Sequence, residues 1–312
     1  MIVLQRPHGI RLFFVLKGSV LQSIAPAILT CTAIALAVTL SRGVLFNWKV
    51  TLSAVPFSLI GLALSIFLGF RNSAAFDRYW EARKLWGDLV HRSRSFARQV
   101  QSLFHRDAPA TPADPHDVRA ALIRRTIAFA HALRHQLRRS DAGADVAPLL
   151  SSTEAREFAE ARLGTHYLLG RIGADVGAAM RAGELDPVIA AHMDDMLSAM
   201  AAVAAGCERI KTTPIPFVYT LLLHRTATLF CLLLPFGLVD LIGYMTPVMV
   251  AFVSYTFFGL AAVGDEIEDP FGIEPNHLPL ETICRTIEID LLEALGEKTL
   301  PAPLAPVNFR LS

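Results

Sequence analysis

Four long stretches of the chain carry almost no charge, and each is long enough to cross a membrane. They cover residues 18–41, 50–70, 213–239 and 241–264. A spanning helix needs about 20 mostly apolar residues, a length that all four stretches reach. The third stretch alone contains ionisable basic side chains, the pair His224-Arg225 near its middle. The pattern predicts four membrane-spanning helices.

These stretches fall into two pairs along the chain. Short links join the members of each pair, whereas residues 71–212 separate the pairs and have the polar composition of a soluble region. Four crossings place both termini and residues 71–212 on one side of the membrane. Lys and Arg are concentrated in residues 71–100 and before the first span. The positive-inside rule therefore predicts that this side is the cytoplasm.

The pattern divides the chain into five segments. They are an N-terminal cytoplasmic segment (1–17), a transmembrane hairpin (18–70), a helical cytoplasmic region (71–212), a second transmembrane hairpin (213–264) and a C-terminal cytoplasmic segment (265–312). Basic residues interrupt the apolar part of the first segment, so it does not have the pattern of a signal peptide. We interpret it as an amphipathic segment at the membrane surface, with a soluble helix packed on the body as the alternative.

Helices are also predicted throughout the region between the hairpins. Residues 117–141 carry apolar side chains at spacings of three and four, namely Ala120, Ile123, Ile127, Ala130 and Leu133. This is the period of an amphipathic helix, and Asp114 or Asp117 is placed to cap its start. Two further helices are predicted over residues 152–169 and 187–210, and no hairpin of strands is evident. The expected fold class is therefore all-α.

The second span presents two different stripes when it is read at every fourth residue. The first stripe is mostly small, and the second is mostly bulky and apolar. They consist of Phe57, Gly61, Ser65 and Gly69, and of Ser58, Leu62, Ile66 and Phe70. Small residues let two membrane helices approach closely, whereas bulky residues around an axis form a hydrophobic constriction that gates by dewetting. The bulky stripe therefore faces either a pore or, as most membrane-helix surfaces do, the lipid.

The charged residues near the spans leave several roles open. Residues 71–100 contain seven Lys or Arg and three Asp or Glu, which suits a basic vestibule, a subunit interface or a solvated helix. Glu81 and Lys84 stand one turn apart there and can pair. Arg225 is costly in lipid, so it is expected to pair with an acidic residue after the fourth span or to lie on an ion path.

An acidic run follows the fourth span. Its carboxylates are Asp265, Glu266, Glu268, Asp269 and Glu274. Clustered carboxylates suit a hard cation such as calcium, but the spacing is not that of an EF-hand, and a solvated helix end has the same composition. His131 and His135 stand one helical turn apart, a spacing that suits zinc. No third ligand is evident beside them, so a polar helix face is the simpler interpretation.

The composition argues against other classes of protein. Lys and Arg number 29 against 28 Asp and Glu, for a net charge of +1, and no basic patch alternates with aromatic residues. Nucleic acid is therefore not an expected partner. The four cysteines are far apart in the sequence, which leaves no metal or redox pair. No phosphate-binding loop, nucleophile elbow or kinase motif is present, so an enzyme is not predicted.

Three segments together resemble the bestrophin family, and its bacterial branch in particular. They are FLGFRNSAAFDRYWEARKLWGDL, where a membrane helix ends at an arginine, AGCERIKTTPIPFVYTLLLHRT, where prolines lead into the third span, and the acidic run DEIEDPFG. The resemblance implies a homopentameric channel with one central pore. It places the pore neck at Leu62, Ile66 and Phe70 and a cytoplasmic constriction at Val188 or Ile189.

The resemblance also bears on calcium, which animal bestrophins bind at the acidic run. The matching positions here are Glu266, Asp269, Glu274 and His277, and the histidine replaces an expected carboxylate. A weak cation site at the three acidic residues is therefore the most that is expected, and no cofactor is predicted.

The predicted function is passive conduction of small monovalent ions, sodium-like cations or chloride, across the bacterial inner membrane. The expected partners are copies of the chain itself, membrane lipids and small ions. The neck carries no charge, so it does not select the sign of the ion. The bacterial resemblance favours cations, which Asp186, Asp194 and Asp195 on the cytoplasmic helices would attract. The alternatives are a secondary transporter, which needs broken helices with polar sites at midplane, and a membrane-anchored scaffold.

Overall fold

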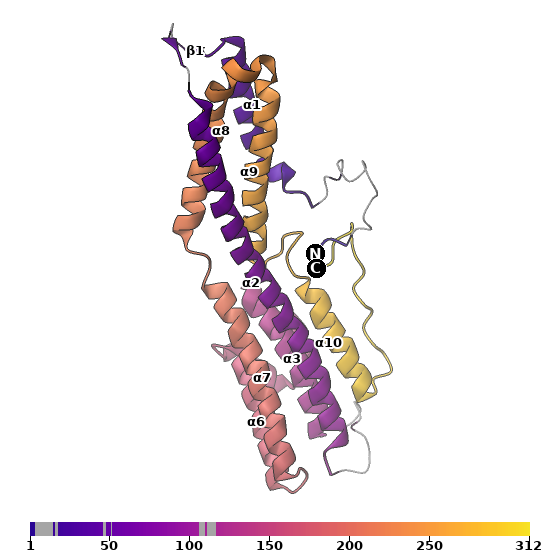
Figure 1. Cartoon of the computed structure of the whole chain (residues 1–312). Coiled ribbons are helices and arrows are strands. Elements are labelled where there is room, and N and C mark those ends of the chain that lie inside the picture. Colours follow the sequence, from indigo (N-terminus) through magenta and orange to yellow (C-terminus); the bar gives the residue numbers. More distant parts are fainter. Residues whose placement is uncertain (4–14, 16–17, 46–47, 51, 106–109, 111–116) are drawn as a thin grey trace. The chain divides into compact units, whose positions relative to one another are not determined.

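The computed structural model of the chain describes residues 1–3, 15, 18–45, 48–50, 52–105, 110 and 117–312. Figure 1 shows that the chain is built from helices, which confirms the all-α fold class. The predicted N-terminal surface segment lies almost entirely outside the described residues, and so does the alternative cap residue Asp114.

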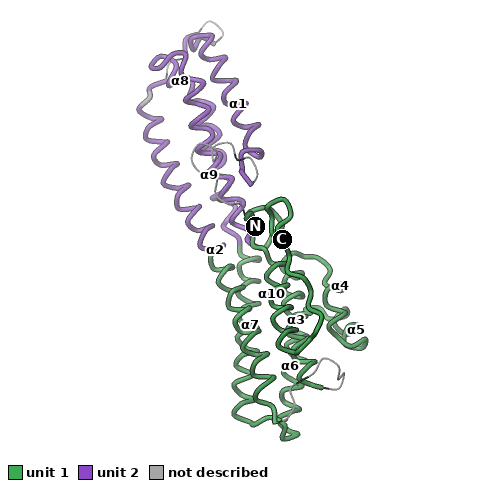
Figure 2. Tube along the Cα trace, turned by 90° about the vertical axis from the view of Figure 1, so that its right-hand side faces the viewer, with its two compact units in different colours: residues 1–3, 80–213, 271–312 green, residues 4–79, 214–270 purple. Residues whose placement is uncertain are grey.

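The chain forms two compact units, which Figure 2 draws in different colours. One contains residues 4–79 and 214–270, and we call it the membrane unit. The other contains residues 1–3, 80–213 and 271–312, and we call it the α3 unit. Helix α2 (Ala54–Ser102) begins in the membrane unit and continues into the α3 unit. The charged stretch after the second span remains helical because it is rich in Arg and Ala, which are strong helix formers.

In the residues that the structure describes, the membrane unit contains four long helices around one apolar core. They are α1 (Leu21–Leu40), the first part of α2, α8 (Phe217–Ile242) and α9 (Thr246–Glu268). Cys31, Leu64, Leu68, Cys231 and Val250 are among the buried residues of the core. These helices contain the four predicted spans, which the hydropathy of an uncharged, helix-length run made recognisable.

By length and apolar composition alone, helix α7 (Pro187–Thr212) also qualifies as a span. The qualifying stretches are Leu21–Leu40, Val55–Ser102, Pro187–Thr212 and Phe217–Glu268. However, α7 belongs to the α3 unit, where its side chains Met193, Met200 and Cys207 are buried. Packing inside the α3 unit therefore accounts for the apolar character of α7.

The links within each pair of spanning helices are short. Strands β1 (Val44–Leu45) and β2 (Trp48–Lys49) form an antiparallel ribbon between α1 and α2. The sequence does not predict this ribbon, because strands of two residues leave no alternating pattern. Between α8 and α9 lies the short turn η3 (Gly243–Met245), and the φ angle of Gly243 is +51°.

Helix α3 (Val118–Arg138) forms the centre of the α3 unit. Asp117 caps it, because its Oδ1 accepts the backbone N–H of Arg119 at 2.9 Å. The predicted apolar stripe is buried, but Leu122 and Phe129 outside that stripe are buried too. The reason is that α6 (Gly164–Arg181) and α10 (Leu280–Leu295) both pack against α3. The helix is therefore enclosed rather than half exposed.

Three short elements lead from α3 to α6. They are α4 (Gly143–Val146), η2 (Ala147–Leu149) and α5 (Ser152–Glu160). The predicted single helix over residues 152–169 is wrong, because the backbone is extended at Ala161 and at Leu163. Phe158 also occupies the space that a side chain on Gly164 would need, so a glycine is required where α6 begins.

Candidate functional site

The predicted neck stripe lies on an exposed face of α2. Leu62, Ile66 and Phe70 are 61%, 49% and 70% exposed, whereas Leu64 and Leu68 on the packing face of the same helix are 3% and 2% exposed. Contiguous exposed apolar side chains mark a surface that something else covers. In a membrane protein that cover is lipid, another copy of the chain or the narrow lumen of a pore.

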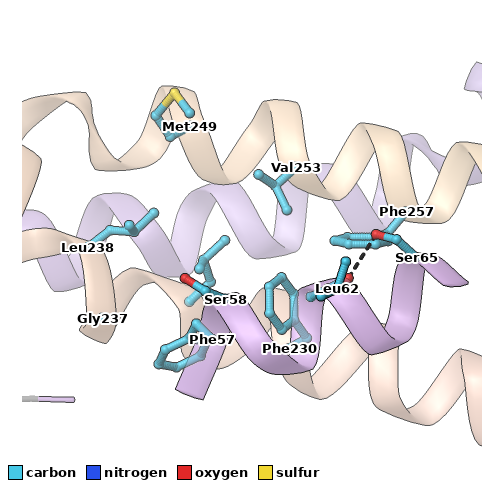
Figure 3. A pocket seen from close by; sticks show the side chains of 12 residues that line it. Phe57, Ser58, Leu62, Ser65, Phe230, Gly237, Leu238, Met249, Val253 and Phe257 are labelled. Carbon is cyan, nitrogen blue, oxygen red and sulfur yellow. Dashed lines mark hydrogen bonds between the residues drawn. The ribbon is translucent and has the colours of Figure 1, made fainter. Parts of the chain in front are cut away.

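The stripe of small residues packs against α8 over its first half. A Cβ on Gly237 of α8 would stand 2.8 Å from the ring of Phe57, and a Cβ on Gly61 would stand 3.3 Å from the ring of Phe230. Figure 3 shows the two rings beside each other, with their centroids 5.8 Å apart. Nothing within 4 Å would meet a Cβ on Gly69. The predicted close contact of helices therefore forms inside the subunit at one end of the stripe and leaves the other end open.

A cavity of about 370 Å³ lies between α2, α8 and α9 beside the neck stripe (Figure 3). Leu62 and Ser65 of α2 are among its lining residues, with Phe230 of α8 and Val253 and Phe257 of α9. The hydroxyl of Ser65 donates to the carbonyl oxygen of Gly61 at 2.8 Å, so the cavity walls are largely apolar. Leu62 therefore borders open space, although Gly61 beside it packs against Phe230.

Arg71 follows the neck stripe directly, and only 3% of its side chain is exposed. Its Nη2 forms ion pairs with Asp265 and with Glu268, the second at 3.2 Å, and its Nη1 donates to the carbonyl oxygen of Ala261 at 3.3 Å. The other carboxylate oxygen of Glu268 accepts the backbone N–H of Ile215 at 3.1 Å. One guanidinium group therefore joins α2, the end of α9 and the segment that leads into α8.

The close approach of α2 to α9 at this level depends on Gly264. A Cβ there would stand 3.2 Å from Nη1 of Arg71 and would collide with the side-chain oxygen of Asn72. Asn72 donates from Nδ2 to a backbone carbonyl of α9 at 3.0 Å, and Arg78 donates from Nε to the carbonyl oxygen of Glu268 at 3.2 Å. We call these contacts of Arg71, Asn72 and Arg78 with α9 the arginine clamp.

The clamp overturns the pairing predicted for Arg225. The carboxylates of Asp265 and Glu268 bind Arg71 instead, and Arg225 is exposed and forms no ion pair within the described part of the chain. Sequence reasoning missed Arg71 because its partners lie 194 and 197 residues further along the chain. The signal that could have identified it is its place directly at the end of an uncharged span, where a charge needs a partner.

Several basic residues in the later part of α2 are also neutralised. Glu81 pairs with Arg209 at 2.5 Å, and not with Lys84, with which it could have paired one turn away. The reason is that a helix packed beside α2 offers a cation where an isolated helix would offer only its own. Two further ion pairs are Arg92 with Asp88 at 2.7 Å and Arg94 with Asp290 at 2.6 Å.

The residues predicted for a second constriction lie in the first turn of α7. Asp186 caps this helix, and its Oδ1 accepts the backbone N–H groups of Val188 at 2.8 Å and Ile189 at 3.4 Å. Val188 is 65% exposed, whereas Ile189 is partly buried. Asp194 and Asp195 further along α7 are exposed as well.

The weak cation site at Glu266, Asp269 and Glu274 stays a prediction. In the part of the chain that the structure describes, no three or more His, Cys, Asp or Glu side chains gather closely enough to hold a metal ion. His277, the residue that replaces a carboxylate, is 6% exposed, and its Nδ1 accepts the backbone N–H of Glu274 at 3.1 Å. This histidine therefore stabilises the turn that contains it.

The interpretation of His131 and His135 as a polar helix face is wrong for His131, which is buried, whereas His135 is partly exposed. His131 is 5% exposed and its Nε2 lies 3.4 Å from Glu288, whereas Nε2 of His135 lies 2.7 Å from Asp145. Burial opposes ionisation of Asp145, but the hydrogen bond with His135 and the charge of Arg134 lower its pKa below the ordinary value. The two histidines therefore contact separate carboxylate side chains of the α3 unit.

Comparisons with known proteins match nearly the whole chain. A family model described as Bacterial/Fungal Bestrophin protein matches residues 1–293. The chain is 44% identical to a voltage-dependent anion channel-forming protein of Mesorhizobium japonicum, over 97% of this chain and 96% of that protein. It is 41% identical to the voltage-dependent anion channel-forming protein YneE of Escherichia coli, over 98% of each. A crystal structure of a bacterial bestrophin homologue from Klebsiella pneumoniae is 39% identical, with a TM-score of 0.82 over 88% of this chain and 100% of that chain.

The spanning helices and these matches define the chain as a subunit of a membrane ion channel, and not as an enzyme. More narrowly, the chain belongs to the bestrophin family, as the resemblance of its three sequence segments indicated.

Proposed function

We propose that five copies of the chain surround one pore, and that α2 of each copy lines the neck of that pore with Leu62, Ile66 and Phe70. The observation that carries this proposal is the exposure of these three apolar side chains, while Leu64 and Leu68 of the same helix are buried. Stacked apolar rings conduct ions only when water fills them, so the neck controls conduction by dewetting. The number of copies follows from the family resemblance, and native mass spectrometry of the purified protein tests it.

A second constriction in the proposed pore is formed by Val188. This residue is better suited than Ile189, because Val188 is 65% exposed at the start of α7 and Ile189 is partly buried. The cap that Asp186 provides holds this first helical turn in place. The proposed path of the ions therefore has two apolar constrictions, one in each unit.

Monovalent cations are the proposed permeant ions. The neck has no charged ring that would select a sign. Three arginines of α2 that could attract anions are engaged by carboxylates, namely Arg71, Arg92 and Arg94. In contrast, Asp186, Asp194 and Asp195 are exposed on and beside α7, where Val188 is proposed to line the pore. Exposed carboxylates along a pore raise the local concentration of cations.

Anion conduction is the second candidate. It is supported by the relatives from Mesorhizobium japonicum and Escherichia coli, which are named voltage-dependent anion channel-forming proteins. With an uncharged neck, modest differences in the charge of the wider parts of the pore would decide between the two signs.

The deciding experiment is a reversal-potential measurement on the purified oligomer in a planar bilayer with a gradient of NaCl. A potential near the sodium equilibrium value supports cation conduction, and a potential near the chloride value supports the anion candidate. A flux that saturates with solute and shows no single-channel steps would indicate a secondary transporter. Absence of current from protein that remains oligomeric would contradict the channel proposal and favour a membrane-anchored scaffold.

The proposed location is the bacterial inner membrane, with both termini and residues 71–212 in the cytoplasm. The concentration of Lys and Arg in residues 71–100 supports this orientation. Protease treatment of right-side-out and inverted vesicles tests it, since only inverted vesicles should lose residues 71–212. No cofactor takes part in the proposal, so a calcium chelator is expected to leave the current unchanged.

A further inference from the structure

The arginine clamp places positive charge at the C-terminal end of α9, where the helix needs it. This helix ends in acidic residues, and carboxylates at the C-terminus of a helix oppose its dipole. Glu268, whose side chain is only 18% exposed, sits there beside Asp265. The guanidinium of Arg71 supplies the missing positive charge to both. Removal of one partner from a buried ion pair is strongly unfavourable, so the position of Arg71 is tightly determined.

The position of Arg71 also determines which way the neck residues point. Arg71 lies three and seven residues after Leu68 and Leu64, so all three belong to the face of α2 that packs inside the membrane unit. In a helix of 3.6 residues per turn, each residue is rotated by about 100° from the next. Fixing Arg71 toward α9 therefore turns Phe70 and, one turn earlier, Ile66 away from it.

Residues 54–70 of α2, which lie beside the cavity, carry no charge, so only packing contacts hold the helix at that level. At that level Leu62 and Ser65 border about 370 Å³ of space between α2, α8 and α9. At the clamp, by contrast, Gly264 lets Asn72 and Arg71 lie directly against α9. The clamp therefore adds a charged contact to the packing of Phe57, Gly61, Leu64 and Leu68, which also holds the rotation of this segment.

We propose that Arg71 is a positioning residue of this channel, which holds α2 in the rotation that directs Leu62, Ile66 and Phe70 toward the pore. The proposal rests on the neck described under the proposed function. In this proposal, the acidic end of α9 binds the guanidinium of Arg71, and this contact keeps the neck residues aligned.

The test compares two cysteine reporters on adjacent faces of α2. Ile66→Cys lies on the neck stripe, and Phe67→Cys lies next to it at a position that is 54% exposed. The native cysteines Cys31, Cys207, Cys231 and Cys284 are all buried, so they contribute little background. Full-length protein in vesicles is treated with a charged, water-soluble thiol reagent, and the loss of current is followed with time.

With Arg71 present, the cysteine at position 66 is expected to react and to block the current, and the cysteine at position 67 is expected not to. In the Arg71→Gln background, the ratio of the two reaction rates is expected to fall by about tenfold, because loss of a buried charge pair exceeds the free energy that corresponds to a tenfold change. Arg98→Gln is the matched control, an exposed arginine of the same helix, and should leave the ratio unchanged.

An unchanged ratio in Arg71→Gln overturns the positioning role while leaving the neck intact. A cysteine at position 66 that fails to react even with Arg71 present overturns the proposed neck instead, so the two failures are distinguishable. If Arg71→Gln does not assemble, Arg71→Lys is used, since lysine keeps the charge but cannot reach both carboxylates and a carbonyl in the same fork geometry. An unchanged ratio in Arg71→Lys also overturns the proposal.

Discussion

The two parts of α2 are packed very differently, although they belong to one helix. In the α3 unit, Trp86 and Phe96 have no exposed surface. In the membrane unit, Leu62 and Phe70 are more than half exposed. The later part of the helix is therefore fixed by the core of its own subunit, whereas the neck part is completed only by what lies outside the subunit.

This difference separates stability from function along a single helix. Burial of apolar surface stabilises a fold by about 25 cal/mol for each Å² removed from water. The later part of α2 gains this stabilisation inside the subunit. Substitutions there should destabilise the fold, and substitutions on the neck stripe should change conduction with little effect on folding.

The largest expected loss of stability comes from a substitution in the later part of α2. Trp86→Ala should lower the free energy of unfolding by about 3–5 kcal/mol, because it removes a fully buried indole and leaves a cavity. Denaturant unfolding of the purified protein in detergent measures this loss. Leu62→Ala is the control and should shift the free energy by less than about 0.5 kcal/mol. Equal losses in the two variants would remove the contrast between the two parts.

A smaller loss is expected where α8 meets the neck part of α2. Gly237→Ala should destabilise the protein by about 1–3 kcal/mol, because its Cβ would stand 2.8 Å from the ring of Phe57. Gly69→Ala is the matched control, because nothing within 4 Å opposes its methyl group and alanine favours a helix. Thermal unfolding of both variants tests the comparison, and a larger loss from Gly69→Ala would contradict it.

A dependence on pH should come from the α3 unit. Burial disfavours the charged form of Glu154, but hydrogen bonds from Ser151 and the charge of Arg125 outweigh it and lower its pKa below 4.5. A carboxyl group with a lowered pKa in the folded state stabilises the protein above its unfolded pKa and loses this effect as the pH falls. Unfolding measured from pH 6 downward should therefore show a loss of stability below about pH 4.5.

The substitution Glu154→Gln separates this carboxyl group from the others in the protein. It should lower stability at neutral pH and flatten the acid dependence, because no proton remains to be bound at that position. An acid dependence as steep as that of the unmodified protein would show that other carboxyl groups cause it.

The smallest effect on stability, and the most direct effect on conduction, is expected at the neck. Ile66→Ala should change the free energy of unfolding by less than about 0.5 kcal/mol, because the side chain is half exposed. It should raise the single-channel conductance, since a smaller side chain widens and wets an apolar ring. An unchanged single-channel current from a correctly assembled variant would contradict a pore-lining position for Ile66.

The spanning helices were predictable because the bilayer imposes a length and a composition on them. The core of α3 was only half predictable, since the stripe from Ala120 to Leu133 revealed one packed face but not the second, which depends on α6 and α10. The break at Ala161 left no proline in the sequence, and its one signal is Gly164, where α6 begins. The ion pairs of Arg71 and Glu81 were missed, because their partners come from helices distant in the sequence.

The long separation between Arg71 and its partners has a consequence for how the subunit is made. Arg71 leaves the ribosome 194 residues before Asp265 and 197 residues before Glu268. Until then, the guanidinium depends on water and lipid headgroups, which the long side chain of an arginine can reach. Because a chain is synthesised from its N-terminus, the clamp closes only after the last spanning helix has been inserted. A translation product that stops before α9 therefore keeps its first hairpin without the lock that α9 provides.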